Sequence, residues 1–188
     1  AKRYAREQGV PYESLNLIVV HMGGGVSVGA HENGKIVDVF NALDGDGAFS
    51  PERAGGAPVG ALIKMCFSGQ YTEKEVYKKF VGNGGFNAYL GTNDMREISS
   101  RAEAGDEACA TFIKGFCVSV AKYIGSLATV VGGKVDAIVL TGGIAYNKLM
   151  VEDIKERVSF IAPVEIYAGE NELESLAENG YGILAGEF

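Results

Sequence analysis

The chain has 188 residues, 47% of them hydrophobic, with 27 glycines and a formal net charge of −7 at pH 7. This length supports one hydrophobic core, and the composition is typical of a folded α/β protein rather than a disordered chain. The negative charge argues against nucleic acid or an anionic membrane as a partner. Because no apolar run approaches about 18 residues, the sequence predicts no membrane span.

The predicted elements alternate between strands and helices and indicate one α/β domain with a mixed sheet. The first half of the chain is predicted to contain a helix at residues 4–8, strands at 17–20, 26–31 and 35–40, a helix at 58–67 and a second helix that begins at residue 72 and ends before the glycines at 82–85. The second half is predicted to contain helices at 96–104 and 105–131, a strand at 135–140, a helix at 147–159, a strand at 163–167 and a helix at 170–184. Residues 33–34, Asn-Gly, predict a tight hairpin between the second and third strands. His31, beside this hairpin, is expected to be solvated.

Two of the predicted strands end in glycine turns, HMGGG at residues 21–25 and TGG at residues 141–143. Glycine has no Cβ atom, so the backbone amides of such a turn can approach a phosphate closely. No GK[ST] follows the first turn and no helix opens there, which excludes a P-loop and a dinucleotide fingerprint. Since ligands of open α/β sheets bind beyond the carboxyl ends of strands, the two turns are candidates for two halves of one nucleotide site. The alternative is two structural turns that need positive φ.

The loop at residues 41–57 is long for a compact domain, and loops of this length are often functional. It carries Asp44, Asp46 and Glu52 with Arg53 near its end. An arginine guanidinium is suited to phosphoryl or carboxylate oxygens, although an ion pair of Arg53 with Glu52 is the alternative interpretation. The three cysteines form no CxxC pair and have no histidine cluster nearby. They predict reduced thiols in a cytoplasmic protein rather than a zinc site.

The order of strand, glycine turn, strand, Asn-Gly hairpin and strand resembles the second phosphate motif of the sugar kinase, Hsp70 and actin superfamily. HMGGG, SPERAGG, GTNDMRE, LTGGIAYN and PVEIYAGENELESLA resemble segments of the acetate and butyrate kinases, and the resemblance covers nearly the whole chain. It implies that residues 1–188 form the C-terminal lobe of the actin-like (ribonuclease H-like) ATPase fold, with the N-terminal lobe absent from this sequence. It also implies a homodimer.

The resemblance further implies a reaction, the transfer of a phosphoryl group between ATP and a short-chain fatty acid such as butyrate, with Mg²⁺. It assigns His21 and Arg53 to catalysis, and Gly23, Gly24 and Gly25 to the β and γ phosphates. No nucleophilic triad is visible, which agrees with in-line transfer driven by positioning and electrostatics. The alternative for His21 is a strand-end histidine that a backbone carbonyl satisfies.

The remaining site residues are also implied by the resemblance. Gly142, Gly143 and Ile144 would approach the adenosine and the α-phosphate, while Asp94, Met95 and Arg96 would line the nucleotide pocket. The methionine stands where acetate kinases have phenylalanine, so a stacking role is not carried over, and Arg96 has an ion pair with Asp94 as its alternative. Glu172 matches a carboxylate implied in Mg²⁺ binding, but it also suits a helix N-terminus.

Two hypotheses follow from this sequence. The first is a butyrate kinase-like phosphotransferase, to which this chain supplies the nucleotide-binding lobe. The second is a non-catalytic nucleotide-binding and dimerisation module, because the superfamily site lies between two lobes and only one is present. A mechanical ATPase of the actin or Hsp70 kind is less favoured, since no other segment resembles those proteins.

Overall fold

The computed structural model describes residues 1–169 and 172–186, with a five-stranded mixed sheet in the order β3-β2-β1-β4-β5. β1 pairs antiparallel with β2 and parallel with β4, and β5 extends the parallel side. The strands are β1 (Leu17–Met22), β2 (Val26–Glu32), β3 (Lys35–Phe40), β4 (Ala137–Gly142) and β5 (Val164–Ala168). This confirms the predicted α/β class and all five predicted strands.

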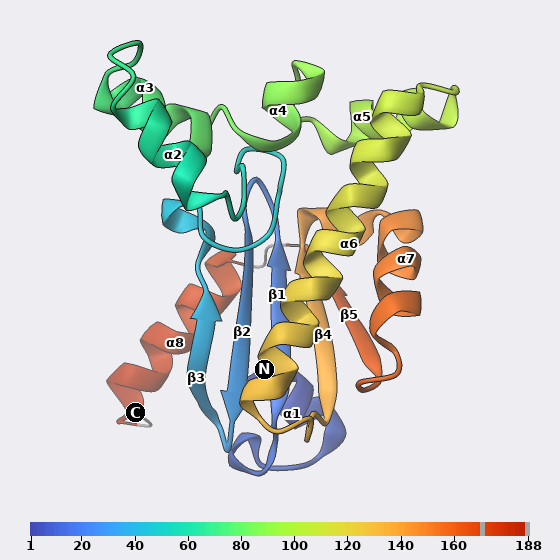
Figure 1. The fold of residues 1–188 in the computed structure, drawn as a ribbon. Coiled ribbons are helices and arrows are strands. Elements are labelled where there is room, and N and C mark those ends of the chain that lie inside the picture. The colour runs from blue at the N-terminus through green and yellow to red at the C-terminus, as the bar shows by residue number, and fades with distance from the viewer. Residues whose placement is uncertain (170–171, 187–188) are drawn as a thin grey trace.

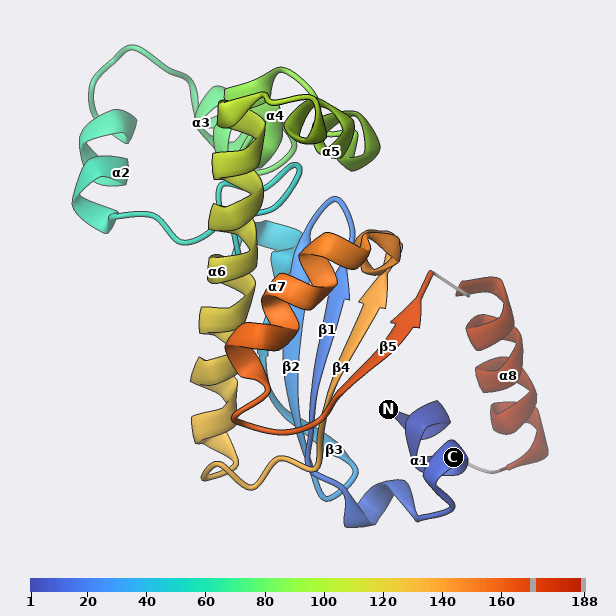
Figure 2. The same cartoon turned by 90° about the vertical axis from the view of Figure 1, so that its right-hand side faces the viewer.

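The helices surround the sheet on both faces and at one edge. Figure 1 shows α4 and α5 beyond the carboxyl ends of β1 and β4, and Figure 2 shows α6 and α7 on one face with α1 and α8 on the other. The helices are α1 (Lys2–Gln8), α2 (Val59–Cys66), α3 (Glu73–Phe80), α4 (Gly85–Leu90), α5 (Met95–Glu103), α6 (Glu107–Val130), α7 (Lys148–Val158) and α8 (Glu172–Ala185), with short 3-10 turns η1 (Tyr12–Ser14), η2 (Ala42–Asp44) and η3 (Gly143–Tyr146).

The core lies between the sheet and α6. Alternate side chains of β1 point to opposite faces, so Ile18 and Val20 pack toward α6 while Leu17 joins a smaller cluster under α1. Apolar side chains along one side of α6 supply the other side of the main core, including the fully buried Phe116 and Ile124. This packing fixes β1 and β4 as the rigid centre from which both glycine turns emerge.

Most turns and helix starts that the sequence indicates are present in the structure. Asn33 and Gly34 have φ of 50° and 76°, as a type I′ hairpin turn requires. The Thr72 side chain accepts from the Glu75 amide and completes a capping box. Some predicted ranges differ from the structure, and β4, for example, runs from Ala137 to Gly142 instead of over residues 135–140. β1 continues to Met22 because the ladder with β2 does, and residues 85–90 form a short helix rather than a turn.

His31 corrects an expectation, because it is not solvated. It is 8% exposed, and its Nδ1 forms a hydrogen bond with the hydroxyl of Tyr12 in η1, which folds over the end of β2. Burial lowers the pKa of His31 because it disfavours the charged imidazolium. The histidine is therefore a packing residue that joins η1 to the sheet.

The helix α6 bears on the expectation that the chain has no membrane span. Among the described residues one helix, α6, is long and apolar enough by length and composition alone. It contains polar and charged positions within that length, which is why no uninterrupted apolar run was visible. Its inner side packs on the sheet, and the core helix of a globular protein passes the same test, so this finding is weak evidence for a membrane.

Candidate functional site

The two glycine turns meet at one edge of the sheet. β1 and β4 are parallel neighbours, with His21 opposite Thr141, so their carboxyl ends lie side by side. Gly142 has φ of 91°, and a Cβ atom there would lie 2.4 Å from the Met22 carbonyl oxygen. Only glycine permits this contact. The structure thus brings together the two segments on which the predicted nucleotide site depends, and it also gives Gly142 the structural role of the alternative interpretation.

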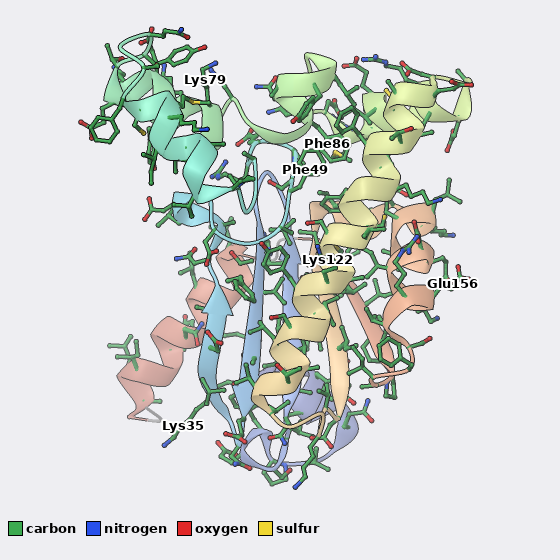
Figure 3. The ribbon with its side chains drawn as sticks, in the orientation of Figure 1. Lys35, Phe49, Lys79, Phe86, Lys122 and Glu156 are labelled. Carbon is green, nitrogen blue, oxygen red and sulfur yellow. The ribbon has the colours of Figure 1, made fainter. Side chains whose placement is uncertain are left out.

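The loop after β3 packs directly on the first glycine turn. The carbonyl of Gly24 accepts hydrogen bonds from the Glu52 amide and from the buried Ser50 hydroxyl, each at 2.9 Å. A Cβ atom at Gly25 would lie 2.8 Å from that of Ala42. Phe49 anchors the same loop on Phe86 of α4, with ring centroids 4.8 Å apart (Figure 3). The turn is therefore held from outside the sheet by a segment 17 to 28 residues further along the chain.

Arg53 lies beside the first turn with only 17% of its side chain exposed. Its Nε donates to the Ala42 carbonyl at 3.0 Å, and its Nη1 donates to the Glu52 carboxylate at 3.2 Å. The ion pair of the alternative interpretation thus exists. Nη2 has no hydrogen-bond partner within residues 1–169 and 172–186, so one side of the guanidinium remains able to donate to a ligand.

His21 is an exposed residue at the carboxyl end of β1, between Ser27 of β2 and Thr141 of β4 in the ladder. Its side chain points to the opposite face from those of the buried Val20 and Met22, as strand alternation requires. Its position next to the glycine turn agrees with the prediction for it.

Asp94 and Arg96 form the ion pair of the alternative interpretation. Asp94 caps α5 by accepting from the Arg96 amide, and its two oxygens also accept from Arg96 Nε and Nη2 at 3.2 and 3.1 Å. These bonds lower the pKa of the Asp94 carboxyl. Arg96 is 93% exposed and Met95 packs against the core. The preceding Asn93 contacts the Glu52 carboxylate at 2.6 Å, which places this loop beside the first turn.

A cavity of about 390 Å³ lies where α5, α6 and α7 meet. Asn147, which caps α7 directly after η3, donates to the Ser99 hydroxyl of α5 at 2.8 Å. Both residues line the cavity, together with mainly apolar neighbours such as Ile113 and Met150. None of the predicted nucleotide residues lines it, but Ser99 and Asn147 each follow one of the predicted segments. The sequence analysis missed both, and the asparagine after TGGIAY was the available signal.

Glu172 is the first residue of α8, but its side chain lies outside the described residues, as do residues 170–171 of the same segment. The preceding Gly169 exchanges two backbone hydrogen bonds of 3.1 Å with Gly142, so the segment begins at the second turn. Within the described ranges no three or more His, Cys, Asp or Glu residues gather as a metal site. The carboxylate of Asp44, in the long loop after β3, accepts a hydrogen bond from the Tyr77 hydroxyl.

Together, the sheet order, the first glycine turn between β1 and β2 and the second turn beside it define a lobe of the actin-like ATPase fold. The chain belongs to the acetokinase family, whose model matches residues 1–180. A probable butyrate kinase of Clostridium botulinum is 60% identical over 187 residues, and Butyrate kinase 2 of Clostridium acetobutylicum is 58% identical. Each match covers 100% of this chain and 53% or 52% of the relative. The predicted family resemblance is confirmed.

Solved structures agree on the fold. A crystal structure of Porphyromonas gingivalis acetate kinase matches with a TM-score of 0.88 at 22% identity, covering 97% of this chain and 52% of that one. A propionate kinase from Francisella tularensis matches with a TM-score of 0.78 at 25% identity, covering 92% and 50%. The chain spans about half the length of the relatives it matches.

Proposed function

We propose that this chain is the nucleotide-binding lobe of a carboxylate kinase that transfers a phosphoryl group between ATP and a short-chain fatty acid, with butyrate as the favoured acceptor. The observation that carries the proposal is the meeting of two glycine turns at adjacent strand ends, with Arg53 packed beside the first. The names of two similar relatives, a probable butyrate kinase and Butyrate kinase 2, support the acceptor class. In this proposal residues 1–188 form the C-terminal lobe of the two-lobed protein.

In the proposed mechanism the first turn receives the β and γ phosphates through the backbone of Gly23, Gly24 and Gly25. His21 and Arg53 flank it and donate hydrogen bonds to the phosphoryl group as charge spreads over its oxygens during in-line transfer. The net charge of −7 makes local donors necessary, because the chain as a whole repels an anionic substrate. No covalent enzyme intermediate is required.

The second turn is proposed to hold the α-phosphate and adenosine at Gly142, Gly143 and Ile144. The cavity beside Ser99 and Asn147 has apolar walls and a hydroxyl–amide pair at its edge, which suits a purine base. Arg96 donates to Asp94 through Nε and Nη2 only, and its side chain is 93% exposed, so the rest of the guanidinium can still donate to a nucleotide.

Mg²⁺ is the proposed metal, and ATP-bound Mg²⁺ commonly uses only one or two carboxylates with phosphate oxygens and water. The described residues contain no dedicated cluster, which fits such a shared site rather than a protein cage. Glu172 remains the proposed carboxylate, since its segment begins beside Gly142. When bound, the metal would neutralise charge on the phosphates.

The second candidate function is a nucleotide-binding and dimerisation module without turnover. It is favoured by one observation, that the chain spans about half the length of its relatives. A hydroxamate assay for acyl phosphate on the chain alone separates the two functions. Turnover by the isolated chain would exclude the module, whereas ADP binding without turnover would support it.

The kinase proposal is tested in a two-lobed protein, made by joining this chain to the half of Butyrate kinase 2 that it does not match. We expect His21→Ala and Arg53→Ala each to lower turnover about 100- to 1,000-fold, as the loss of one transition-state donor does. Arg6→Ala is the control, because Arg6 is exposed on α1 at the far end of the sheet. Unchanged turnover in either site variant contradicts the role assigned to it.

A further inference from the structure

The Glu52 carboxylate lies directly over the first glycine turn. Its Oε2 is 3.1 Å from the position that a Cβ atom would take at Gly24, so the missing side chain of that glycine makes room for it. The backbone of Glu52 is fixed to the same turn, since its amide donates to the Gly24 carbonyl at 2.9 Å. An acidic group at this place needs an explanation, because it repels an anionic ligand at the neighbouring turn.

The carboxylate joins three segments that are distant in sequence. Oε1 accepts from Asn93 Nδ2 at 2.6 Å, in the loop between α4 and α5, and Oε2 accepts from Arg53 Nη1 at 3.2 Å. The glycine turn is the third segment. Glu52 is 34% exposed, so these hydrogen bonds are partly shielded from solvent, and those to a charged group are stronger than neutral ones.

The same contact settles the orientation of Arg53. An arginine side chain is flexible, and a single hydrogen bond would leave its guanidinium plane able to turn. Here Nε is held by the Ala42 carbonyl and Nη1 by Glu52, so two fixed nitrogen atoms define the plane and direct Nη2. The loss of Glu52 would release one of these two constraints and detach the Asn93 loop at the same time.

We propose that Glu52 is a positioning residue for phosphoryl transfer: its carboxylate orients the Arg53 guanidinium and ties the Asn93 loop to the glycine turn. This inference rests on the proposed function, because it presumes that Arg53 donates to the transferring group. Glu52 itself does not touch the phosphoryl group. Its electrostatic repulsion of the ligand is offset by the geometry that it imposes on Arg53.

The test uses Glu52→Ala and Glu52→Gln in the two-lobed protein. We expect Glu52→Ala to lower kcat about 100-fold with KM for ATP changed less than about threefold, since misplacement of a transition-state donor acts on the chemical step. Glu52→Gln keeps an acceptor for Asn93 and is expected to recover about half of the loss on a logarithmic scale. Glu152→Ala is the control, because the Glu152 carboxylate is 67% exposed, pairs with Lys155 at 3.9 Å and is not among the residues that line the proposed purine cavity.

A double variant decides whether Glu52 acts through Arg53. In the Arg53→Ala background, Glu52→Ala is expected to have no further effect on kcat, because the group that it orients is gone. If the two losses multiply, or if Glu52→Ala has wild-type kcat, the proposal is overturned. Unfolding midpoints of all variants identify a loss that comes from misfolding.

A measurement that does not depend on turnover tests the positioning role of Glu52 separately from the carboxylate kinase function. In the ¹⁵N-labelled chain the Arg53 Nη–H signals are expected to be visible, to broaden in Glu52→Ala and to persist in the Glu152→Ala control. Unchanged Arg53 signals in Glu52→Ala would overturn the positioning role. An inactive two-lobed wild-type protein would instead contradict the carboxylate kinase function, whatever the Arg53 signals show.

Discussion

Replacement of Gly142 by alanine tests the contact that joins the two glycine turns. Gly142 has φ of 91°, where a residue with a Cβ atom is strained by roughly 1–3 kcal/mol. The new methyl would also lie 2.4 Å from the Met22 carbonyl oxygen and 2.7 Å from its amide nitrogen, and relief of such overlap costs roughly 1–3 kcal/mol more. We therefore expect the free energy of unfolding to fall by about 4 kcal/mol, which is a large part of the roughly 5–15 kcal/mol typical of a domain.

The assay is urea unfolding of the chain followed by circular dichroism, with thermal unfolding as a second measure. A loss of about 4 kcal/mol corresponds to a midpoint lower by about 8–16 °C in a domain of this size. The control is Gly115→Ala in α6, where a Cβ atom meets nothing within 4 Å. Alanine is the better helix former, so this control is expected to gain about 0.5–1 kcal/mol. If Gly142→Ala is as stable as the wild type, β1 and β4 do not meet as described.

Three further predictions concern pH and thiol reactivity. Burial lowers the pKa of His31, so below about pH 6.5 the unfolded chain binds more protons than the folded chain. The free energy of unfolding should therefore decrease as the pH falls below this value. His31→Gln should remove this contribution to the pH dependence. Asp106, at the start of α6, has a pKa lowered to about 2, mainly by a hydrogen bond from the backbone amide of Cys109. The free energy of unfolding should therefore also fall between about pH 4 and pH 2, and this fall should be smaller in Asp106→Ala. In a thiol assay under native conditions Cys66 should react rapidly, while the buried Cys109 and Cys117 should react only on unfolding.

Much of the fold could be predicted because its signals are local. The apolar run at residues 17–20, the Asn33-Gly34 turn and the three- and four-residue spacing along α6 each depend on neighbours in sequence. The predictions that failed depend on distant partners. His31 is buried by η1, and the end of β1 at Met22 is set by its pairing with Val26 of β2.

In the candidate site, too, the local features could be predicted from the sequence and the contacts between distant residues could not. The glycines at residues 23–25 and 142–143 could be found in sequence, because a turn without side chains is unusual at the end of a buried strand. The ion pairs of Arg53 and Arg96 were foreseen as alternatives, yet only the structure shows that both form. Asn93 carried no sequence signal, since its importance comes from the carboxylate that it meets 41 residues away.

The sequence by itself determined the strands, the helices and the two glycine turns of this protein, since those features follow from the conformational preferences of neighbouring residues. The tertiary structure decided that β1 and β4 lie side by side, and therefore that the turns share one edge. It also decided which side chains surround them, because long-range contacts arise only when the whole sheet assembles and no local pattern encodes a partner 100 residues away.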